Sequence, residues 1–291
     1  MNGFNIRDLE NLSGIKAHTI RIWEKRYHFL KPGRSNTNIR HYGSDELKTL
    51  LNVALLNKNG YRISSIAEMS PETITATILS LPSSDAQNER MINDLLNTMV
   101  DLNARAFEEV IDAYIAKKGI EHTISGLLFP FLQKIGILWL TDHIRIAQEH
   151  MVSNIIRQKI IRGIEDANVQ PANSAPVVLF LPAGEHHEIG LLYVYYLLKM
   201  RGLNIIYLGA DVPISELEYV CKIKQPRCLY THLISLPSRF NFEKYLTSLT
   251  DIIGETTLMI SGSITHTYRK KIPNRISFLK SLDEVLETLA A

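Results

Sequence analysis

The strongest constraint on the fold of this chain is a change of hydrophobic period near residue 177. Between residues 90 and 167, apolar residues recur at three- and four-residue steps, which is the period of packed helices. From residue 177 onward, short apolar runs such as PVVLFLP and NIIYLG alternate with helical segments such as GLLYVYYLLKMRG. Strands that alternate with helices form parallel βαβ units. The sequence therefore predicts a helical region followed by a doubly wound parallel sheet.

Polar, turn-rich segments divide the 291 residues into parts. The segment SLPSSDAQNE at 80–89 separates an N-terminal module from the helical region. A second polar segment, EDANVQPANSAP at 165–176, separates the helical region from the predicted sheet. We therefore expect four regions: an N-terminal module at 1–75, a linker at 76–89, a helical bundle at 90–167 and a Rossmann-like α/β domain at 177–291.

The N-terminal module is basic, whereas the remainder of the chain is nearly neutral. Residues 1–75 hold 11 Lys and Arg against 7 Asp and Glu, and the remainder holds 21 against 23. The excess is concentrated at residues 16–40, where seven basic residues accompany a single acidic residue, Glu24. A small basic module joined to a neutral body is typical of a polyanion-binding domain with a separate function behind it.

Cysteine content and hydropathy indicate a cytoplasmic protein. The two cysteines, Cys221 and Cys228, are too few for a zinc cluster or a disulfide framework. The N-terminus lacks the apolar core of a signal peptide. The longest apolar region, at 127–140, is interrupted by Gln133 and Lys134 and is shorter than the roughly 20 residues that span a bilayer.

Residues 5–30 predict a helix, a turn and a second helix. The first segment, IRDLENLSG, ends at Gly14, a residue typical of helix C-termini. In the second segment, Ile20, Trp23 and Tyr27 form an apolar stripe that would pack inward. The other faces carry the candidate DNA contacts Thr19, Arg21, Lys25 and Arg26. A recognition helix presents such residues to phosphates and base edges.

The next residues predict a β-wing that leads into a helix. The segment PGRSNTN is rich in turn-forming residues, and Arg40 and Tyr42 alternate as in a strand. Ser44 would cap the helix that begins DELKTLLNVALL. Arg34 and Arg40 are candidate DNA contacts on this wing. Tyr42 could contact a phosphate through its hydroxyl or pack between the wing and the core.

Residues 4–69 resemble the winged helix-turn-helix domain of the MerR family. In the second helix, Arg21-x-Trp23-Glu24 is similar to the family's Arg-x-aromatic-Glu pattern. In the wing and the following helix start, the match is carried by Arg40, His41, Tyr42, Asp45 and Glu46. The resemblance implies binding to pseudo-palindromic, double-stranded operator DNA by at least a dimer.

The loop after the first predicted strand carries candidate ligand residues. Ligands of doubly wound sheets bind at the carboxyl ends of strands, where this chain has AGEHHEIG at 183–190. A neutral histidine ring nitrogen could coordinate a metal, and Glu185 could hold the other nitrogen. On chemistry alone, His186 and His187 are both candidates, and either could simply form hydrogen bonds. A zinc site is disfavoured because no further Cys or His ligands stand at suitable spacing.

The spacing Glu185-x-His187-x-x-Gly190 resembles the cobalamin-binding signature. The resemblance implies base-off cobalamin, with His187 as the lower cobalt ligand and the nucleotide tail inserted into the sheet domain. Two further segments fit the signature, Ser235-Leu236 after the third strand and Ser261-Gly262 after the fourth. The family usually has a Gly-Gly pair at the second of these positions. Glu185, in place of the usual Asp, is typical of the regulator branch.

The helical region contains a tryptophan that is followed after nine residues by a Glu-His pair. Thr141-Asp142 signals a helix start, so Trp139 would end one helix while Glu149 and His150 lie on the next. In an antiparallel helix pair, the three side chains could face one cavity. An indole face, a carboxylate and an imidazole suit an adenosyl group. The alternative is that Trp139 is a core residue and His150 a hydrogen-bonded helix histidine.

This Trp-x9-Glu-His pattern resembles the helical cap of CarH- and LitR-like photoreceptor regulators, which lies over the upper face of adenosylcobalamin. Pro130 and Ile135-Gly136 also match the pattern of this cap. Photosensing members have a histidine directly after the tryptophan, which takes the upper cobalt site after illumination. Leu140 stands at that position and cannot ligate cobalt, and His143 is a candidate substitute.

These features predict a multidomain α and α/β protein with a winged helix-turn-helix head, a helical-bundle cap and a flavodoxin-like cobalamin-binding sheet. We expect a transcriptional regulator, not an enzyme, that binds adenosylcobalamin and operator DNA. Its homo-oligomeric state, dimer or tetramer, would change with the ligand, and a response to light stays open. Two alternatives are a cobalamin carrier module of a methyltransferase-type enzyme and a regulator whose cobalamin site is vestigial.

Overall fold

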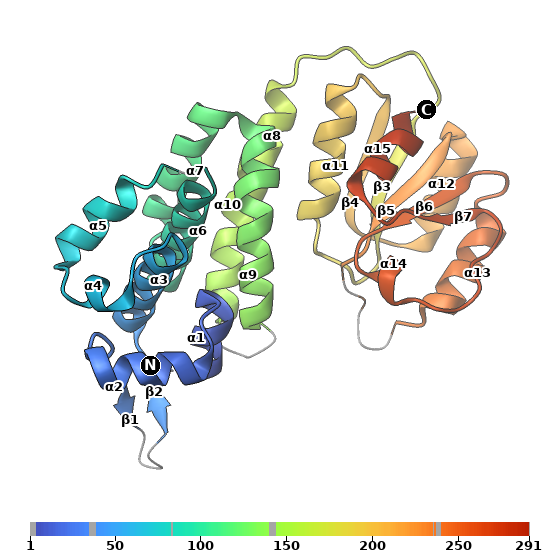
Figure 1. The fold of residues 1–291 in the computed structure, drawn as a ribbon. Helices are drawn as coiled ribbons and strands as arrows, with labels where there is room; N and C mark the ends of the chain where they lie inside the picture. Colours follow the sequence, from blue (N-terminus) through green and yellow to red (C-terminus); the bar gives the residue numbers. More distant parts are fainter. Residues whose placement is uncertain are drawn as a thin grey trace. The chain divides into compact units, whose positions relative to one another are not determined.

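The computed structural model describes residues 4–34, 39–82, 84–139, 144–234, 236 and 240–290. The chain forms two compact units, with the boundary between Ile156 and Arg157 (Figure 1). We call them the helical unit and the α/β unit. Within the described residues, no helix combines the length and the apolar character that crossing a membrane requires.

The helical unit begins with two short helices and a wing, as the sequence predicts. Helix α1 spans Ile6–Ser13 and α2 spans Ala17–Tyr27. Helix α1 ends at Gly14, whose φ of 72° is easily adopted by glycine. The wing consists of β1 (Gly33–Arg34) and β2 (Arg40–His41), which pair antiparallel.

Helix α3, at Ser44–Lys58, follows the wing. Its cap is Gly43, whose backbone N–H donates to Glu46 Oε2 at 2.9 Å. The prediction that Ser44 is the capping residue was therefore wrong by one position. The Glu46 carboxylate accepts the backbone N–H of Gly43, which has no hydrogen-bond partner within the helix.

The rest of the helical unit is built from consecutive helices that include one π-helical turn (Figure 1). They are α4 (Ile63–Ala67), α5 (Pro71–Leu79), α6 (Ser84–Val100), α7 (Ala104–Lys118), α8 (Ile120–Thr123), η1 (Ile124–Leu128), α9 (Phe129–Trp139) and α10 (Ile146–Asp166). Helix α10 continues into the α/β unit, because the boundary between the units falls within it.

The segment at 76–89, expected to be a linker, differs from that expectation. The end of α5 and the start of α6 occupy most of it. Leu81 and Ala86 are buried, so this segment packs against the unit instead of bridging two domains. Helix α5 ends at Leu79, three residues before Pro82, and α6 begins at Ser84 and buries Ala86.

The winged head and the helical bundle share one core. Helix α3 packs against α6, and α1 packs against α9. Two ion pairs join α3 to the bundle: Lys48 to Asp101 at 2.6 Å and Lys58 to Glu89 at 2.5 Å. Inside the bundle, the rings of Phe107 and Phe131 lie 5.5 Å apart and are fully buried.

The α/β unit contains a five-stranded parallel sheet of order β4-β3-β5-β6-β7. The strands are β3 (Val177–Pro182), β4 (Ile205–Val212), β5 (Cys228–His232), β6 (Thr257–Ser261) and β7 (Ile276–Phe278). The helices are α11 (Ile189–Met200), α12 (Ile214–Lys224), α13 (Phe242–Ile252), α14 (Ile264–Thr267) and α15 (Leu282–Ala290). This order confirms the predicted doubly wound, flavodoxin-like fold, whose topological switch lies between β3 and β5.

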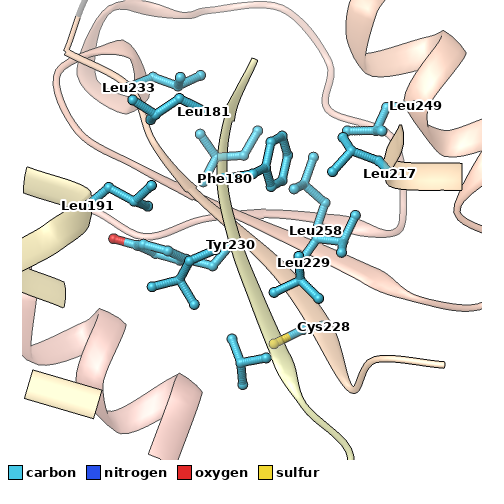
Figure 2. Packing of buried hydrophobic residues seen from close by; sticks show 14 of the residues in the cluster. Phe180, Leu181, Leu191, Leu217, Cys228, Leu229, Tyr230, Leu233, Leu249 and Leu258 are labelled. Carbon is cyan, nitrogen blue, oxygen red and sulfur yellow. The ribbon is translucent and has the colours of Figure 1, made fainter. Parts of the chain in front are cut away.

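Strand β3 runs through the middle of the hydrophobic core (Figure 2). All six of its residues are buried, because helices cover both faces of the sheet. Figure 2 shows Leu191 of α11 on one side of Phe180 and Leu217 of α12 on the other. This packing holds the carboxyl end of β3, and the loop that follows it, on a rigid base.

Candidate functional site

The loop after β3 brings Glu185 and His187 together. Glu185 is 2% exposed, and its Oε1 lies 2.5 Å from Nδ1 of His187. The same oxygen accepts the backbone N–H groups of His186 and His187 at 2.9 and 2.8 Å. The side chain of His187 is 61% exposed. A neutral imidazole that donates from Nδ1 carries its lone pair on Nε2, which is the arrangement of a metal-ligating histidine.

Asp211 fixes this loop from the end of β4. Its Oδ1 accepts the backbone N–H of Gly184 at 2.8 Å, and its own N–H donates to the Glu185 carbonyl at 3.2 Å. Asp211 has a φ of 60°, which is uncommon for a residue other than glycine. Asp211 was not predicted from the sequence, because nothing local in ADVP indicates a contact with a loop 27 positions earlier.

Glu188 anchors the other end of the loop. Its carboxylate accepts hydrogen bonds from Arg157 of α10 and from the hydroxyl of Tyr207 in β4, the latter at 2.9 Å. Burial and the neighbouring Glu188 carboxylate raise the pKa of Tyr207 well above its usual value. The Tyr207 ring stacks on Tyr195 of α11 with centroids 5.1 Å apart. These contacts hold the start of α11 to β4 and to α10.

Two predicted site glycines are required by the packing of the chain itself. A Cβ atom at Gly190 would lie 2.4 Å from Cδ2 of His232. A Cβ atom at Gly262, where φ is 96°, would lie 2.3 Å from the carbonyl oxygen of Leu233. A larger residue at Gly190 would therefore displace the His232 ring, and one at Gly262 would displace the backbone at Leu233.

A buried polar network joins the ends of β5 and β6. Ser261 Oγ lies 2.7 Å from Nδ1 of His232 and 2.6 Å from the hydroxyl of Tyr230. Burial lowers the pKa of His232 to about 4, so its ring is neutral at physiological pH. Ser261 stands at the strand end as predicted, while Ser235 lies outside the described residues. His232 was not predicted from the sequence, although it is the last residue of β5 and so stands at a strand end, where ligands of such sheets bind.

The predicted upper-face residues are Trp139, Glu149 and His150. Trp139 is the last residue of α9, and its side chain lies outside the described part of the structure. Glu149 Oε1 accepts the hydroxyl of Ser153 at 2.7 Å, and Glu149 Oε2 lies 3.5 Å from Nε2 of His150. The two residues therefore form one polar group near the start of α10.

The residues between α9 and α10 include further predicted positions. Leu140, Thr141, Asp142 and His143 lie outside the described residues. Helix α10 begins at Ile146, later than the expected start at Thr141-Asp142. The side chain of Gln148 accepts the backbone N–H of Arg145 at 3.0 Å, so an amide takes the capping role.

The predicted DNA-contacting residues of α2 and β1 face solvent. Ile20 and Trp23 are buried, and Tyr27 is half-buried, as the stripe predicts. The residues on the other faces are half-buried Thr19 and exposed Arg21, Lys25 and Arg26, with exposed Arg34 on the wing. The guanidinium of Arg26 lies 5.5 Å from the centre of the Tyr27 ring.

Glu24 ties the wing to α2. Its Oε1 lies 3.0 Å from Nε of Arg40, and its Oε2 accepts the hydroxyl of Tyr42 at 2.9 Å. Tyr42 is fully buried, so the structure favours the packing role over the phosphate contact proposed for this residue. Arg40 is half-buried and paired with Glu24, and Arg34 is exposed. The Arg-x-Trp-Glu pattern of α2 and the pattern of the wing are therefore joined through the side chain of Glu24.

Two family models match the chain. The model of the MerR HTH family of regulatory proteins matches residues 4–73, which include α1, α2, the wing and α3. The model of the B12 binding domain matches residues 91–162, which cover most of α6 through most of α10. The two matches follow the order predicted for the head and the cap.

Similar proteins include two transcriptional repressors of Myxococcus xanthus. The HTH-type transcriptional repressor CarA is 32% identical over 76% of this chain and 73% of its own length. The HTH-type transcriptional repressor CarH is 25% identical over 84% of each chain. The monomethylamine corrinoid protein of Methanosarcina barkeri shares the fold with a TM-score of 0.56 and 17% identity, over 70% of this chain and 98% of that chain. The chain thus belongs to the MerR-type, DNA-binding transcriptional regulators with a B12-binding domain, together with CarA and CarH.

Proposed function

We propose that this regulator binds adenosylcobalamin, with His187 as the lower cobalt ligand. The contact between His187 Nδ1 and the buried carboxylate of Glu185 carries the proposal. A buried acceptor fixes the ring and its tautomer before any ligand arrives, which raises the basicity of the remaining nitrogen. His186 follows the same carboxylate in the chain, but the ring in contact with Glu185 is that of His187.

The described residues fit a cofactor that brings its own metal. Among them, no group of three or more His, Cys, Asp or Glu side chains could hold a metal ion by itself. A single oriented histidine suits cobalt that a corrin ring already coordinates. His187 would hold the metal, and Gly190, Ser235, Ser261 and Gly262 would border the nucleotide tail. When bound, adenosylcobalamin supplies a cobalt–carbon bond that light can break.

Residues of the helical unit would contact the upper face of the cofactor. We propose that Trp139 packs beside the adenosyl group and that Glu149 accepts hydrogen bonds from its ribose hydroxyls. His150 would support the edge of this pocket through its contact with Glu149. This assignment rests on the Trp-x9-Glu-His spacing and on the shared polar group of Glu149 and His150.

We propose that cofactor binding regulates the assembly of the protein on DNA. The head would bind operator DNA as at least a dimer, because MerR-type heads recognise pseudo-palindromic sites. The bound cofactor would shift the balance between dimer and tetramer and, with it, the affinity for the operator. A protein that acts on chromosomal DNA would work in the cytoplasm, and as a regulator it would catalyse no reaction.

The test is the visible spectrum and the cofactor content of the purified protein after incubation with adenosylcobalamin and gel filtration. The wild-type protein and the matched control His186→Ala should retain the cofactor with a base-off spectrum. His187→Ala should lose it. Glu185→Gln, which removes the charge and keeps the volume, should weaken retention by roughly 10- to 100-fold. Equal loss in both histidine variants, or in neither, would contradict the assignment of His187.

A further inference from the structure

Helix α2 carries an apolar residue on its solvent-facing side. Ile22 is 48% exposed, while Ile20 and Trp23 on the same helix are buried. Successive residues of an α-helix are separated by about 100°. The direction opposite the buried stripe therefore runs through His18, Ile22 and Lys25. Ile22 thus lies on the face that α2 turns away from the core, on the side of that face nearer to Arg26.

The surroundings of Ile22 are basic. Arg21, Lys25 and Arg26 are exposed on the same helix. The guanidinium of Arg26 packs over the ring of Tyr27, so its positive charge lies at one edge of the solvent-facing side of α2. An isolated exposed isoleucine needs no explanation on an ordinary surface. An isoleucine at the centre of a basic recognition helix is different, because the helix must bury that face against DNA.

We infer that Ile22 is a sequence-reading residue that contacts the C5-methyl group of a thymine in the major groove. Each base pair presents a distinct edge in that groove, and the methyl group of thymine is its apolar feature. Ile22 has no hydrogen-bond donor or acceptor in its side chain, so it cannot read the polar positions. The exposed Arg21 and Lys25 supply the positive charge that holds the helix against the phosphates.

This contact would distinguish thymine from uracil, because the two bases differ only by the methyl group. Burial of one methyl-sized group contributes about 0.8 kcal/mol. Removing the thymine methyl should therefore weaken binding roughly fourfold for each half-site. A cytosine at that position would also lack the methyl group, so the contact favours a T·A pair.

The experiment uses duplexes that the full-length protein selects from random DNA. Each thymine of a selected duplex is replaced by uracil, at matched positions of both half-sites, and binding is measured for wild type and Ile22→Ala. We expect one position per half-site at which uracil weakens the wild type but leaves Ile22→Ala unaffected. At other thymines, the two proteins should respond alike.

Two variants separate this role from a general loss of affinity. Lys25→Ala should weaken binding to every duplex and keep the uracil effect at the Ile22 position. Ile22→Val, which keeps a branched apolar side chain, should retain part of the effect. Since Ile22 is 48% exposed, both Ile22 variants should unfold close to the wild-type temperature. Identical uracil responses of wild type and Ile22→Ala at every thymine would overturn the inference.

Discussion

Two carboxylates orient side chains of the proposed cofactor site and of the winged head. Glu185 is buried and holds the ring of His187 together with two backbone N–H groups. Glu24 accepts from both Arg40 and Tyr42 and so joins the wing to the recognition helix. Hydrogen bonds to charged acceptors are roughly twice as strong as neutral ones. Single acidic residues therefore set the local geometry in both units.

The position of Tyr42 leads to a prediction about stability and DNA binding. Tyr42→Phe removes the hydroxyl that donates to Glu24 and keeps the buried ring. We expect the free energy of unfolding to fall by about 1.5–3 kcal/mol, the usual contribution of a hydrogen bond to a charged group. Because the hydroxyl contacts Glu24, the salt dependence of DNA binding should stay unchanged. Denaturant unfolding and binding titrations at several salt concentrations measure the two quantities.

The opposite pattern would contradict the packing role of Tyr42. If the hydroxyl contacted a phosphate, Tyr42→Phe would leave stability unchanged and reduce DNA affinity. Arg34→Ala is the matched control on the wing, because Arg34 is exposed on β1. That variant should lower the slope of log affinity against log salt by roughly one unit, if Arg34 contacts a phosphate as predicted.

Asp211 provides a second prediction for single residues. Asp211→Ala removes the acceptor for the Gly184 N–H and leaves a residue that adopts a φ of 60° less readily. We expect unfolding free energy to fall by about 1–2 kcal/mol and adenosylcobalamin retention to weaken. Asp211→Asn, which keeps an acceptor oxygen, should stay close to wild type. Wild-type retention in Asp211→Ala would show that the loop needs no such support.

At the scale of elements, α2 and α10 each carry side chains that serve more than one structural or functional role. Helix α2 buries Ile20 and Trp23, binds the wing through Glu24, and exposes its basic residues. Helix α10 holds Glu149 and His150 near its start, and Arg157 two turns later contacts Glu188 in the loop region after β3. One continuous helix thus joins the proposed upper-face residues to the segment that carries His187.

The charge on α2 and the wing gives a prediction about DNA. Replacing Arg21, Lys25, Arg34 and Arg40 individually by alanine should weaken binding to all sequences when the residue contacts a phosphate. Each replacement of a phosphate-binding side chain should lower the salt slope by roughly one unit. Arg40→Ala should also reduce stability, because it breaks the ion pair with Glu24. If the quadruple variant bound operator DNA with wild-type affinity, this face would not be the DNA-binding surface.

At the scale of the whole molecule, the winged head belongs to the same compact unit as the bundle. Helices α1 and α3 pack on α9 and α6, so the head is joined to the bundle by a shared core. The loop with His187 lies in the other unit. Helix α10 starts in the helical unit and ends in the α/β unit, so it connects the head and bundle to the unit that carries the proposed cofactor loop.

The response to light is the prediction that belongs to this scale. Trp139→Ala should reduce the preference for adenosylcobalamin over methylcobalamin, because the space beside the adenosyl group would no longer be filled. Illumination of the wild-type complex should change its oligomeric state, since the loss of the adenosyl group alters the proposed pocket. Absorption spectra and light scattering before and after illumination measure both effects. Equal retention of both cobalamins by the wild-type protein would contradict the pocket.

Leu140 sets an expectation for the illuminated form. Leucine cannot ligate cobalt, so we expect a weak upper ligand, such as water, unless His143 supplies an imidazole. The matched variant is His143→Ala, compared with wild type by absorption spectroscopy after illumination. A spectrum typical of two histidine ligands that persists in His143→Ala would contradict both the weak-ligand expectation and the role of His143.

The sequence by itself determined the order of elements and the regions of candidate function. The change of apolar period at residue 177 was enough to predict the parallel sheet, and Gly14 to predict the end of α1, because both depend on neighbouring residues. The contact of Glu185 with His187 was also predictable, since only one residue separates the two.

The tertiary structure decided which of several possible partners each polar residue has. Tyr42 and Glu24 are 18 residues apart, Gly184 and Asp211 are 27 apart, and His232 and Ser261 are 29 apart. The end of α5 and the start of α6 lie within the segment at 76–89, where the core of the bundle buries Leu81 and Ala86. Local patterns encode backbone conformation and periodicity, whereas these contacts form only when the packing of distant segments brings the groups together and excludes water.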